Sequence, residues 1–464
     1  MGKNKLKKIT IILLILLTTM VAFWGVYSKV QNRMENGVKD YEYSRGLKGS
    51  RVITLKVSDE TKETIKDSNG NIIESATDEE ITQNGYVKES QPINGEDKLT
   101  VENYNSIKSI LDARLQRLYV NDYEIRLNES NGEIEILLRE DDRTDKVISS
   151  LTTVGKFEII DAETKEVLMN NDDIKTSEAL RSNTEDGVAI YLSIEFNGEG
   201  KKKLEDITKT YVKVAQTNTT AENAEGNTET PKEKQITMKI DDQDIMSTSF
   251  GEPITDGKLY LNVGNPSTDK DTLNESLEQA RNMSSILSNK NMPLTYKQVG
   301  NIYVASELNE NLTISIVIGI AIIATVVLFI FVIKYKLRGA LATCAYIGAI
   351  SLLLLIIRYT NVVLSIEGIV ALFTILVANF ALINKILAGL KANKDDKKVE
   401  QKKVINKAIK DFTLKVIPLF IMAVVFTFMS WVPTSSFGMV IFWGLTITVL
   451  YNLLITKSLV KDEN

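Results

Sequence analysis

Long runs of apolar residues lie near both ends of the chain, and the segment between them is rich in charged residues. The first run covers residues 9–28, follows four lysines and contains no charged side chain. As a helix of about twenty residues it is long enough to cross a hydrocarbon layer of roughly 30 Å. A cleaved signal peptide is the alternative. The run ends with Phe23, Trp24 and Tyr27 rather than small residues, which favours an uncleaved membrane anchor.

Five further runs have the length and apolar composition of membrane spans, and polar or charged turns separate them. They cover residues 312–333, 339–357, 362–383, 412–431 and 437–456. Short cytoplasmic segments collect Lys and Arg. The tail 1–8, the turn 334–338 and the loop 385–411 are Lys-rich, while the alternate turns carry a single Arg. The pattern predicts cytoplasmic termini (1–8 and 458–464) and a large segment, 29–311, on the opposite side of the membrane.

Within segment 29–311, alternating strand patterns and amphipathic helix patterns recur in a regular order. The pattern predicts strands at 51–57, 122–128, 132–138 and 156–160, and helices at 103–119 and 145–152. Along the chain the order is strand, helix, strand, strand, helix, strand. This is the order of a ferredoxin-like unit. A second round runs from residue 188 to residue 299, which predicts two units at about 45–165 and 186–302.

Two stretches of this segment are too polar to bury a core, and we expect both to be flexible insertions. They cover residues 215–235 and much of 68–97. The predicted fold is therefore a multi-span α-helical membrane protein with six transmembrane helices, a five-helix part at 312–457, and a large extracytoplasmic α+β domain of ferredoxin-like units.

Composition excludes several kinds of chemistry. The chain has no His, which removes imidazole catalysis and imidazole metal ligands, and its one cysteine, Cys344, lies in an apolar run. No nucleotide-binding P-loop pattern occurs. Acidic clusters such as 140–142, 172–173 and 241–242 lack the spacing of a calcium loop and are interpreted as solvated turns. We therefore expect no catalytic residue, metal or cofactor, and the acidic outer segment argues against a nucleic-acid partner.

The order of parts, one anchor, a large outer α+β domain and then five spans, resembles the SecD family of the resistance-nodulation-division superfamily. Four consecutive segments carry the resemblance most specifically: IEFNGEGKKKLEDIT, ITMKIDDQDIMSTSFGEPI, GKLYLNVG and ARNMSSILSNKNMPLTY. In the membrane part, Tyr335 and Gly339 are similar to the family's Y-R-x-x-G, and residues 364–386 are similar to its fourth span.

The resemblance implies an auxiliary subunit of the Sec protein-export translocase in the bacterial cytoplasmic membrane. In that family the outer domain assists the movement or release of preproteins, driven by the proton-motive force. The implied partners are a SecF-like six-span subunit, the SecYEG channel and the unfolded preprotein.

One departure from the family concerns ion coupling. Aligning Asn379 with the family's Asn places Val377 at the position of the intramembrane Asp, and an ungapped alignment from Gly368 places Ala381 there. Neither residue titrates, although coupling needs a group that changes charge inside the membrane. Two alternatives therefore stay open beside the export role: an uncoupled membrane scaffold of the same family, or an efflux transporter half for lipids or small molecules.

Four polar residues remain as candidate intramembrane positions. Glu367 is the acid nearest to the missing Asp, and Arg358 lies across the same short turn, so we expect an ion pair between them near the outer surface. Asn379 and Asn384 are interpreted as interhelical hydrogen-bond partners rather than transport residues. Their five-residue spacing places them about 140° apart around a helix, so they face different neighbours.

Overall fold

The computed structural model describes residues 3–30, 33–68, 70–73, 77–212, 234–241, 243–306, 311–393 and 401–461. The chain forms two compact units. One combines residues 1–50 with 305–464 and is mainly helical, and the other covers residues 51–304 and is α+β. A multi-span helical portion with a sizeable α+β portion, as predicted, is confirmed at this level.

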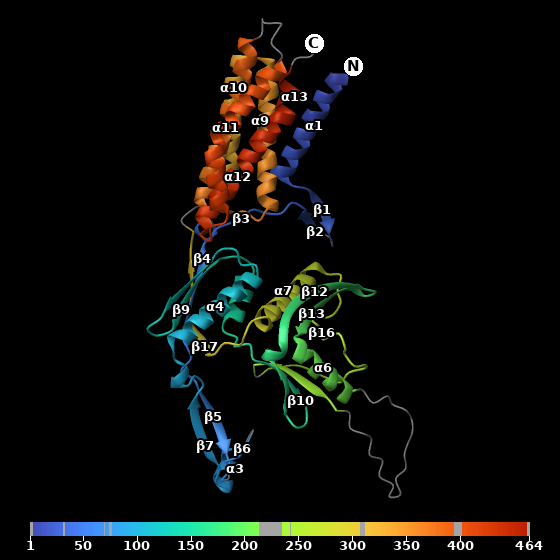
Figure 1. Ribbon diagram of the computed structural model, residues 1–464, viewed down its shortest axis with the longest axis vertical. Helices are drawn as coiled ribbons and strands as arrows, with labels where there is room; N and C mark the ends of the chain where they lie inside the picture. The colour runs from blue at the N-terminus through green and yellow to red at the C-terminus, as the bar shows by residue number, and fades with distance from the viewer. Residues whose placement is uncertain are drawn as a thin grey trace. The chain divides into compact units, whose positions relative to one another are not determined.

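The helical unit consists mainly of long helices (Figure 1). They are α1 (Lys3–Trp24), α8 (Leu312–Tyr335), α9 (Leu337–Tyr359), α10 (Ile366–Ala392), α11 (Gln401–Thr427) and α12 (Val432–Tyr451), followed by the π-helical turn η3 (Asn452–Thr456) and α13 (Lys457–Val460). Among the described residues, five helices are long and apolar enough to cross a membrane. The sixth predicted span lies in α11, which is not one of these five because charged residues occupy its first half; six spans stay a prediction.

Four predicted spans have clearly different boundaries in the structure. The two predicted at 412–431 and 437–456 correspond to α11, which ends at Thr427, and to α12, which begins at Val432. The first helix ends at Trp24 rather than at residue 28, because Gly25 follows it with a φ of 80° and turns the chain. Strand β1 (Tyr27–Val30) then pairs antiparallel with β2 (Arg33–Asn36). In the fourth predicted span, residues Val363–Leu364 form β18, which pairs in parallel with β3 (Glu42–Tyr43).

Helix α10 therefore begins later than predicted, at Ile366. The Ser365 hydroxyl caps it by accepting a hydrogen bond from the Gly368 N–H at 3.2 Å. The helix then continues to Ala392, well beyond the predicted end at 383. Small residues such as Gly339 and Gly444 lie at buried helix contacts, which lets neighbouring helices approach closely.

The α+β unit contains a four-stranded sheet in the order β17-β4-β9-β8. Its strands are β4 (Ser50–Val57), β8 (Tyr123–Asn128), β9 (Glu133–Arg139) and β17 (Tyr296–Val304), and they share one hydrophobic core with α4 (Val101–Arg117) and α5 (Thr144–Leu151). The first five elements match the predicted first round. The predicted closing strand at 156–160 is wrong, because the fourth strand of this sheet is β17, from the far end of the unit.

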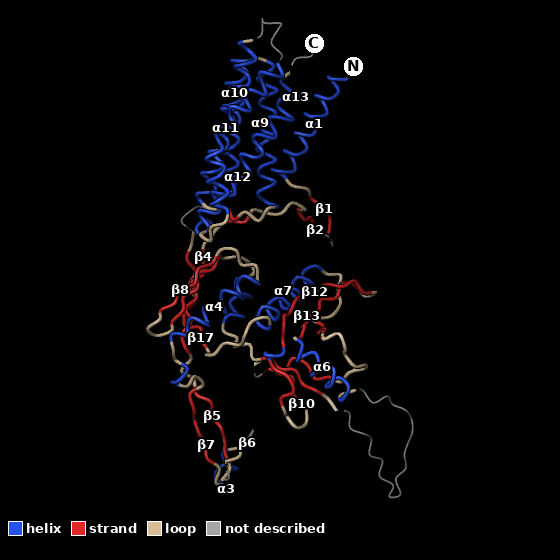
Figure 2. Tube along the Cα trace, in the orientation of Figure 1, coloured by secondary structure: helices blue, strands red, loops and turns tan. Residues whose placement is uncertain are grey.

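Two further sheets share a second core with α6 (Gly198–Thr210) and α7 (Lys270–Leu287). One sheet has the order β11-β10-β14-β15 and the other the order β12-β13-β16 (Figure 2, red). Their strands are β10 (Phe157–Asp161), β11 (Val167–Asn170), β12 (Ile174–Thr184), β13 (Gly187–Phe196), β14 (Ile236–Ile240), β15 (Gln243–Thr248) and β16 (Lys258–Asn262). The closing strands of the two predicted units are thus interchanged: β17 belongs to the first sheet, and β10 pairs with strands of the second unit. Ferredoxin-like units stay a prediction.

The stretch 68–97, expected to be a flexible insertion, carries regular structure. It contains β6 (Ile72–Ile73), α3 (Asp78–Asn84) and β7 (Val87–Pro92). Strands β6 and β7 flank β5 (Thr61–Lys66) in a three-stranded sheet. Helix α3 begins with a capping box between Thr77 and Glu80. Most of the other predicted insertion, 215–235, lies outside the described residues.

Candidate intramembrane polar site

A buried pair of amides joins α10 to the end of α12. The Asn452 side-chain amide donates hydrogen bonds to Asn379 Oδ1 at 2.8 Å and to the Thr448 carbonyl oxygen at 2.7 Å. Asn452 is the first residue of the π-helical turn η3, in which backbone hydrogen bonds join residues five apart instead of four. Within the described residues, Asn452 Oδ1 and Thr456 Oγ1 are buried without a hydrogen-bond partner. The sequence analysis missed Asn452, although an amide inside the apolar run 437–456 was a signal for it.

The second amide contacts a different helix. The Tyr335 hydroxyl of α8 donates a hydrogen bond to Asn384 Oδ1 at 2.8 Å. Asn379 and Asn384 therefore each bond to another helix, and to different ones, as the 140° separation requires. These bonds use the amides as structural links between helices. A transport role for either residue stays a prediction.

Val377, one of the two positions where the resemblance implies an Asp, faces away from this pair. Val377 is 67% exposed, so its side chain points away from the other helices of this chain. The neighbouring Leu376 is buried, and its carbonyl oxygen accepts a hydrogen bond from the Tyr346 hydroxyl at 3.1 Å. Residue 377 thus combines an apolar side chain with an outward orientation.

The predicted ion pair between Arg358 and Glu367 is wrong. Glu367 is exposed in the first turn of α10 and accepts a hydrogen bond from the Ser365 hydroxyl at 2.8 Å. The Arg358 guanidinium lies over the Tyr41 ring instead, 4.2 Å from its centroid. Burial raises the pKa of the Tyr41 phenol, and the nearby Arg358 charge opposes that rise. The pairing of β3 with β18 brings Tyr41 to this end of α9, which the local sequence around Arg358 does not reveal.

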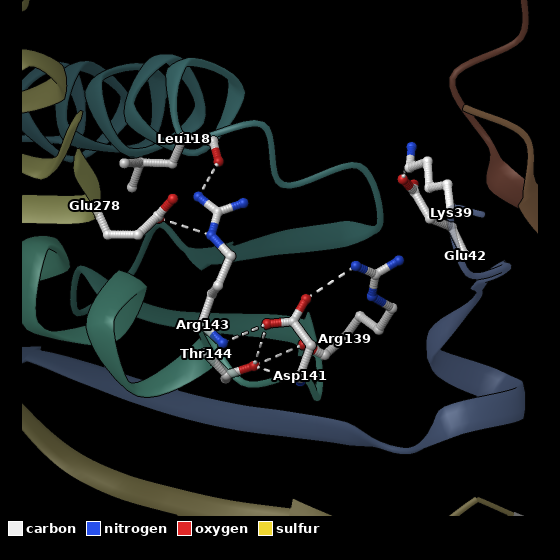
Figure 3. Close-up of polar contacts among 8 residues, drawn as sticks. All are labelled: Lys39, Glu42, Leu118, Arg139, Asp141, Arg143, Thr144 and Glu278. Atoms are coloured by element: carbon white, nitrogen blue, oxygen red, sulfur yellow. Dashed lines mark hydrogen bonds and ion pairs between the residues drawn. The ribbon is translucent and has the colours of Figure 1, made fainter. Parts of the chain in front are cut away.

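In the α+β unit, the acidic cluster 140–142 takes part in ion pairs and in the turn that leads into α5. Figure 3 shows Asp141, whose carboxylate accepts hydrogen bonds from the Arg143 N–H at 2.9 Å and from the Arg139 guanidinium at 2.9 Å. Arg51 and Glu140 form a bidentate ion pair, in which Arg51 Nε donates to Glu140 Oε2 at 2.8 Å and Arg51 Nη2 donates to Glu140 Oε1 at 2.7 Å. Over the part of the chain that the structure describes, no group of three or more Cys, Asp or Glu side chains is placed to hold a metal ion.

Two arginines connect elements within the same unit. Arg143 donates to Glu278 of α7 at 2.7 Å and to the Leu118 carbonyl oxygen at 2.8 Å, as Figure 3 shows. Arg114 of α4 is fully buried, and its guanidinium donates to the carbonyl oxygens of residues 150, 153 and 154. Burial lowers the pKa of Arg114 to about 10, so the group stays charged at neutral pH. These contacts hold the segment between α5 and β10.

A solved structure of SecDF has a fold similar to that of this chain. A crystal structure of SecDF in its super-membrane-facing form aligns with 98% of this chain and 57% of its own length, with a TM-score of 0.54 and 16% sequence identity. The fold is SecD-like. The family resemblance seen in the sequence is therefore confirmed at the level of the fold.

Two further comparisons give lower scores. SecDF from Thermus thermophilus, a translocon-associated membrane protein, aligns with 99% of this chain and 58% of its own, with a TM-score of 0.45 and 15% identity. A SecDF structure described as a membrane component that enhances protein export aligns with 54% of this chain and 98% of its own length. Its TM-score is 0.33 and its sequence identity is 13%. This SecD-like chain thus spans somewhat more than half of the SecDF chains that it matches along nearly its whole length. No protein-family model matches the sequence, and no curated protein does.

Proposed function

We propose that this protein is an auxiliary subunit of the Sec protein-export translocase. The SecD-like fold over 98% of the chain is the observation that carries the proposal. In this proposal the α+β unit receives emerging polypeptide on the far side of the membrane and assists its movement or release. The helical unit anchors it in the bacterial cytoplasmic membrane, and the Lys-rich segments support cytoplasmic termini.

The proposed partners are the SecYEG channel, an unfolded preprotein and a SecF-like six-span subunit. Transporters of this superfamily work as paired six-span halves, which supports the last of these. The chain has no His, and the described acids show no metal-binding arrangement, so the proposal assigns it no enzymatic step.

We propose further that position 377 carries no proton. Val377 does not titrate, and the neighbouring Asn379 is occupied by its hydrogen bond to Asn452. In cells depleted of the protein, Val377→Ala and Asn379→Ala variants should then restore secretion as well as the unchanged chain. A loss of secretion comparable to deletion would contradict this part of the proposal.

Glu367 is the remaining acid at this end of α10, and it provides the contrasting test. If Glu367 carries the coupling proton, Glu367→Gln abolishes the stimulation of export at normal protein abundance. If Glu367→Gln is silent as well, the uncoupled scaffold is the better description. Pulse-chase labelling of an exported protein, with and without an uncoupler, measures both outcomes.

Crosslinking to a stalled exported chain tests the main proposal. A photoreactive residue at the exposed Tyr260 of the α+β unit should capture a preprotein halted in the channel. The matched control places the same group at the exposed Leu337, at the predicted cytoplasmic end of α9. Equal capture at both positions, or none at Tyr260 when the channel is occupied, would overturn the export role and favour an efflux transporter half.

A further inference from the structure

An apolar crevice lies between α8, α9 and α10 in the helical unit. Its walls are aliphatic side chains of these helices, among them Ile320, Leu354, Ile357 and Leu372. The segment before α2 (Arg45–Lys48) completes it, because Tyr41 and Tyr43 lie against the same space. The crevice therefore sits near the end of the helices from which the chain continues into the α+β unit.

The crevice opens on the surface of α8 beside Val317, where the exposed side chains of Val317 and Ile318 are apolar. Val317 lines it and is 36% exposed, whereas Ile320, almost one turn further along, is 3% exposed. The neighbouring Ile318 is 53% exposed and belongs to the outer surface of the helix. Since α8 is one of the helices long and apolar enough to cross a membrane, acyl chains rather than water would meet this opening.

A cation without an acidic partner lies beside the crevice. Arg358 follows Ile357 of the lining, and its guanidinium rests on the ring of Tyr41, another lining residue. Across the described residues Arg358 forms no ion pair, and its Nε is buried without a hydrogen-bond partner. Lys39, close to the same segment, is instead paired with Glu42 at 2.8 Å. Arg358 thus contacts Tyr41 but has no acidic partner among the described residues, so a negatively charged ligand could pair with it.

We propose that this crevice binds one phospholipid with an anionic headgroup. An acyl chain would fill the apolar space and make van der Waals contacts with the lining side chains, which an empty space does not provide. The phosphate would lie near Arg358, where a negative group compensates the partly desolvated guanidinium. This combination of an apolar slot and one cation fits a lipid better than a soluble anion, which has no apolar part.

The test uses the purified full chain, reconstituted in nanodiscs of phosphatidylglycerol and phosphatidylcholine in equal amounts. After gentle extraction, native mass spectrometry counts the lipids retained on each protein molecule. We expect one retained lipid, enriched in phosphatidylglycerol. Val317→Trp, which fills the opening, should lower this retention by about tenfold or more. Ile318→Trp, the same change on the outer surface of α8, should leave it unchanged.

The charge is tested separately with Arg358→Gln, which should leave a lipid bound but remove the preference for phosphatidylglycerol. Lys336→Gln, which removes one charge from an exposed residue between α8 and α9, is the control and should keep the preference. Equal retention in Val317→Trp and the unchanged chain would overturn the proposal. So would retention that ignores the headgroup in the unchanged chain, or loss of a co-purifying protein rather than a lipid in Val317→Trp. Size-exclusion profiles and melting curves establish that each variant is folded.

Discussion

Replacing the buried Arg114 by Met is expected to loosen the α+β unit where α4 meets the segment leading to β10. The guanidinium donates to the Ser150, Thr153 and Val154 carbonyl oxygens, at 3.1, 2.5 and 3.1 Å. Met has a comparable length and can fill most of the space. The substitution therefore removes the hydrogen bonds and the charge with a limited change in volume.

The magnitude follows from two opposing contributions. The Val154 carbonyl oxygen also accepts a hydrogen bond from the Met292 N–H at 3.0 Å and keeps it. Each of the other two carbonyls costs about 1–3 kcal/mol when it is left unpaired, so together they cost about 2–6 kcal/mol. Removing the charge relieves a desolvation cost of about 3 kcal/mol, converted from the lowered pKa of Arg114. The net loss in the free energy of local unfolding is then about 1 kcal/mol at the middle of the range, because Met restores neither the charge nor the donors.

Hydrogen exchange of the full chain in detergent, followed by mass spectrometry, measures this loss in the peptides covering residues 101–117 and 150–161. A loss of about 1 kcal/mol corresponds to exchange roughly fivefold faster. Arg117→Met is the matched control, since Arg117 lies on the same helix but is exposed. Unchanged or slower exchange in Arg114→Met would refute the reasoning that the buried guanidinium holds this segment by its hydrogen bonds.

Two further substitutions test packing and acid stability. Gly339→Ala should destabilise the helical unit by about 1–3 kcal/mol in SDS titration, because its new Cβ would lie 2.0 Å from a backbone oxygen of α8; Gly319→Ala, with its nearest contact at 3.6 Å, should be nearly neutral. The Tyr211 hydroxyl, 2.6 Å from Asp161, is the main cause that lowers the pKa of Asp161 to about 2. Its stabilising effect is complete above the ordinary carboxyl pKa near 4 and is lost as the pH falls towards 2, so Tyr211→Phe should unfold at a higher pH in circular dichroism. Exposed Tyr260→Phe should not change that midpoint, and an unchanged midpoint in Tyr211→Phe would contradict the assignment.

Local pattern was a reliable guide to elements and a poor guide to their partners. The helix at 103–119 and the strands at 51–57 and 132–138 were predicted close to their observed bounds. Arg114 occupies a core-facing position of that helix, one turn after Ile110 and Leu111, so its burial was readable from the helical period. The expected closing strand failed because alternation marks a strand but does not identify the strand it pairs with.

The sequence by itself determined the long apolar helices, the α+β character of the segment between them and the family resemblance that the fold comparison confirmed. These follow from composition and period along the chain, which act over a few residues. Only the tertiary structure decided that β17 rather than β10 completes the first sheet, that Tyr41 rather than Glu367 meets Arg358, and that Asn452 meets Asn379. Each of these contacts joins residues far apart in the chain, and packing in three dimensions selects them.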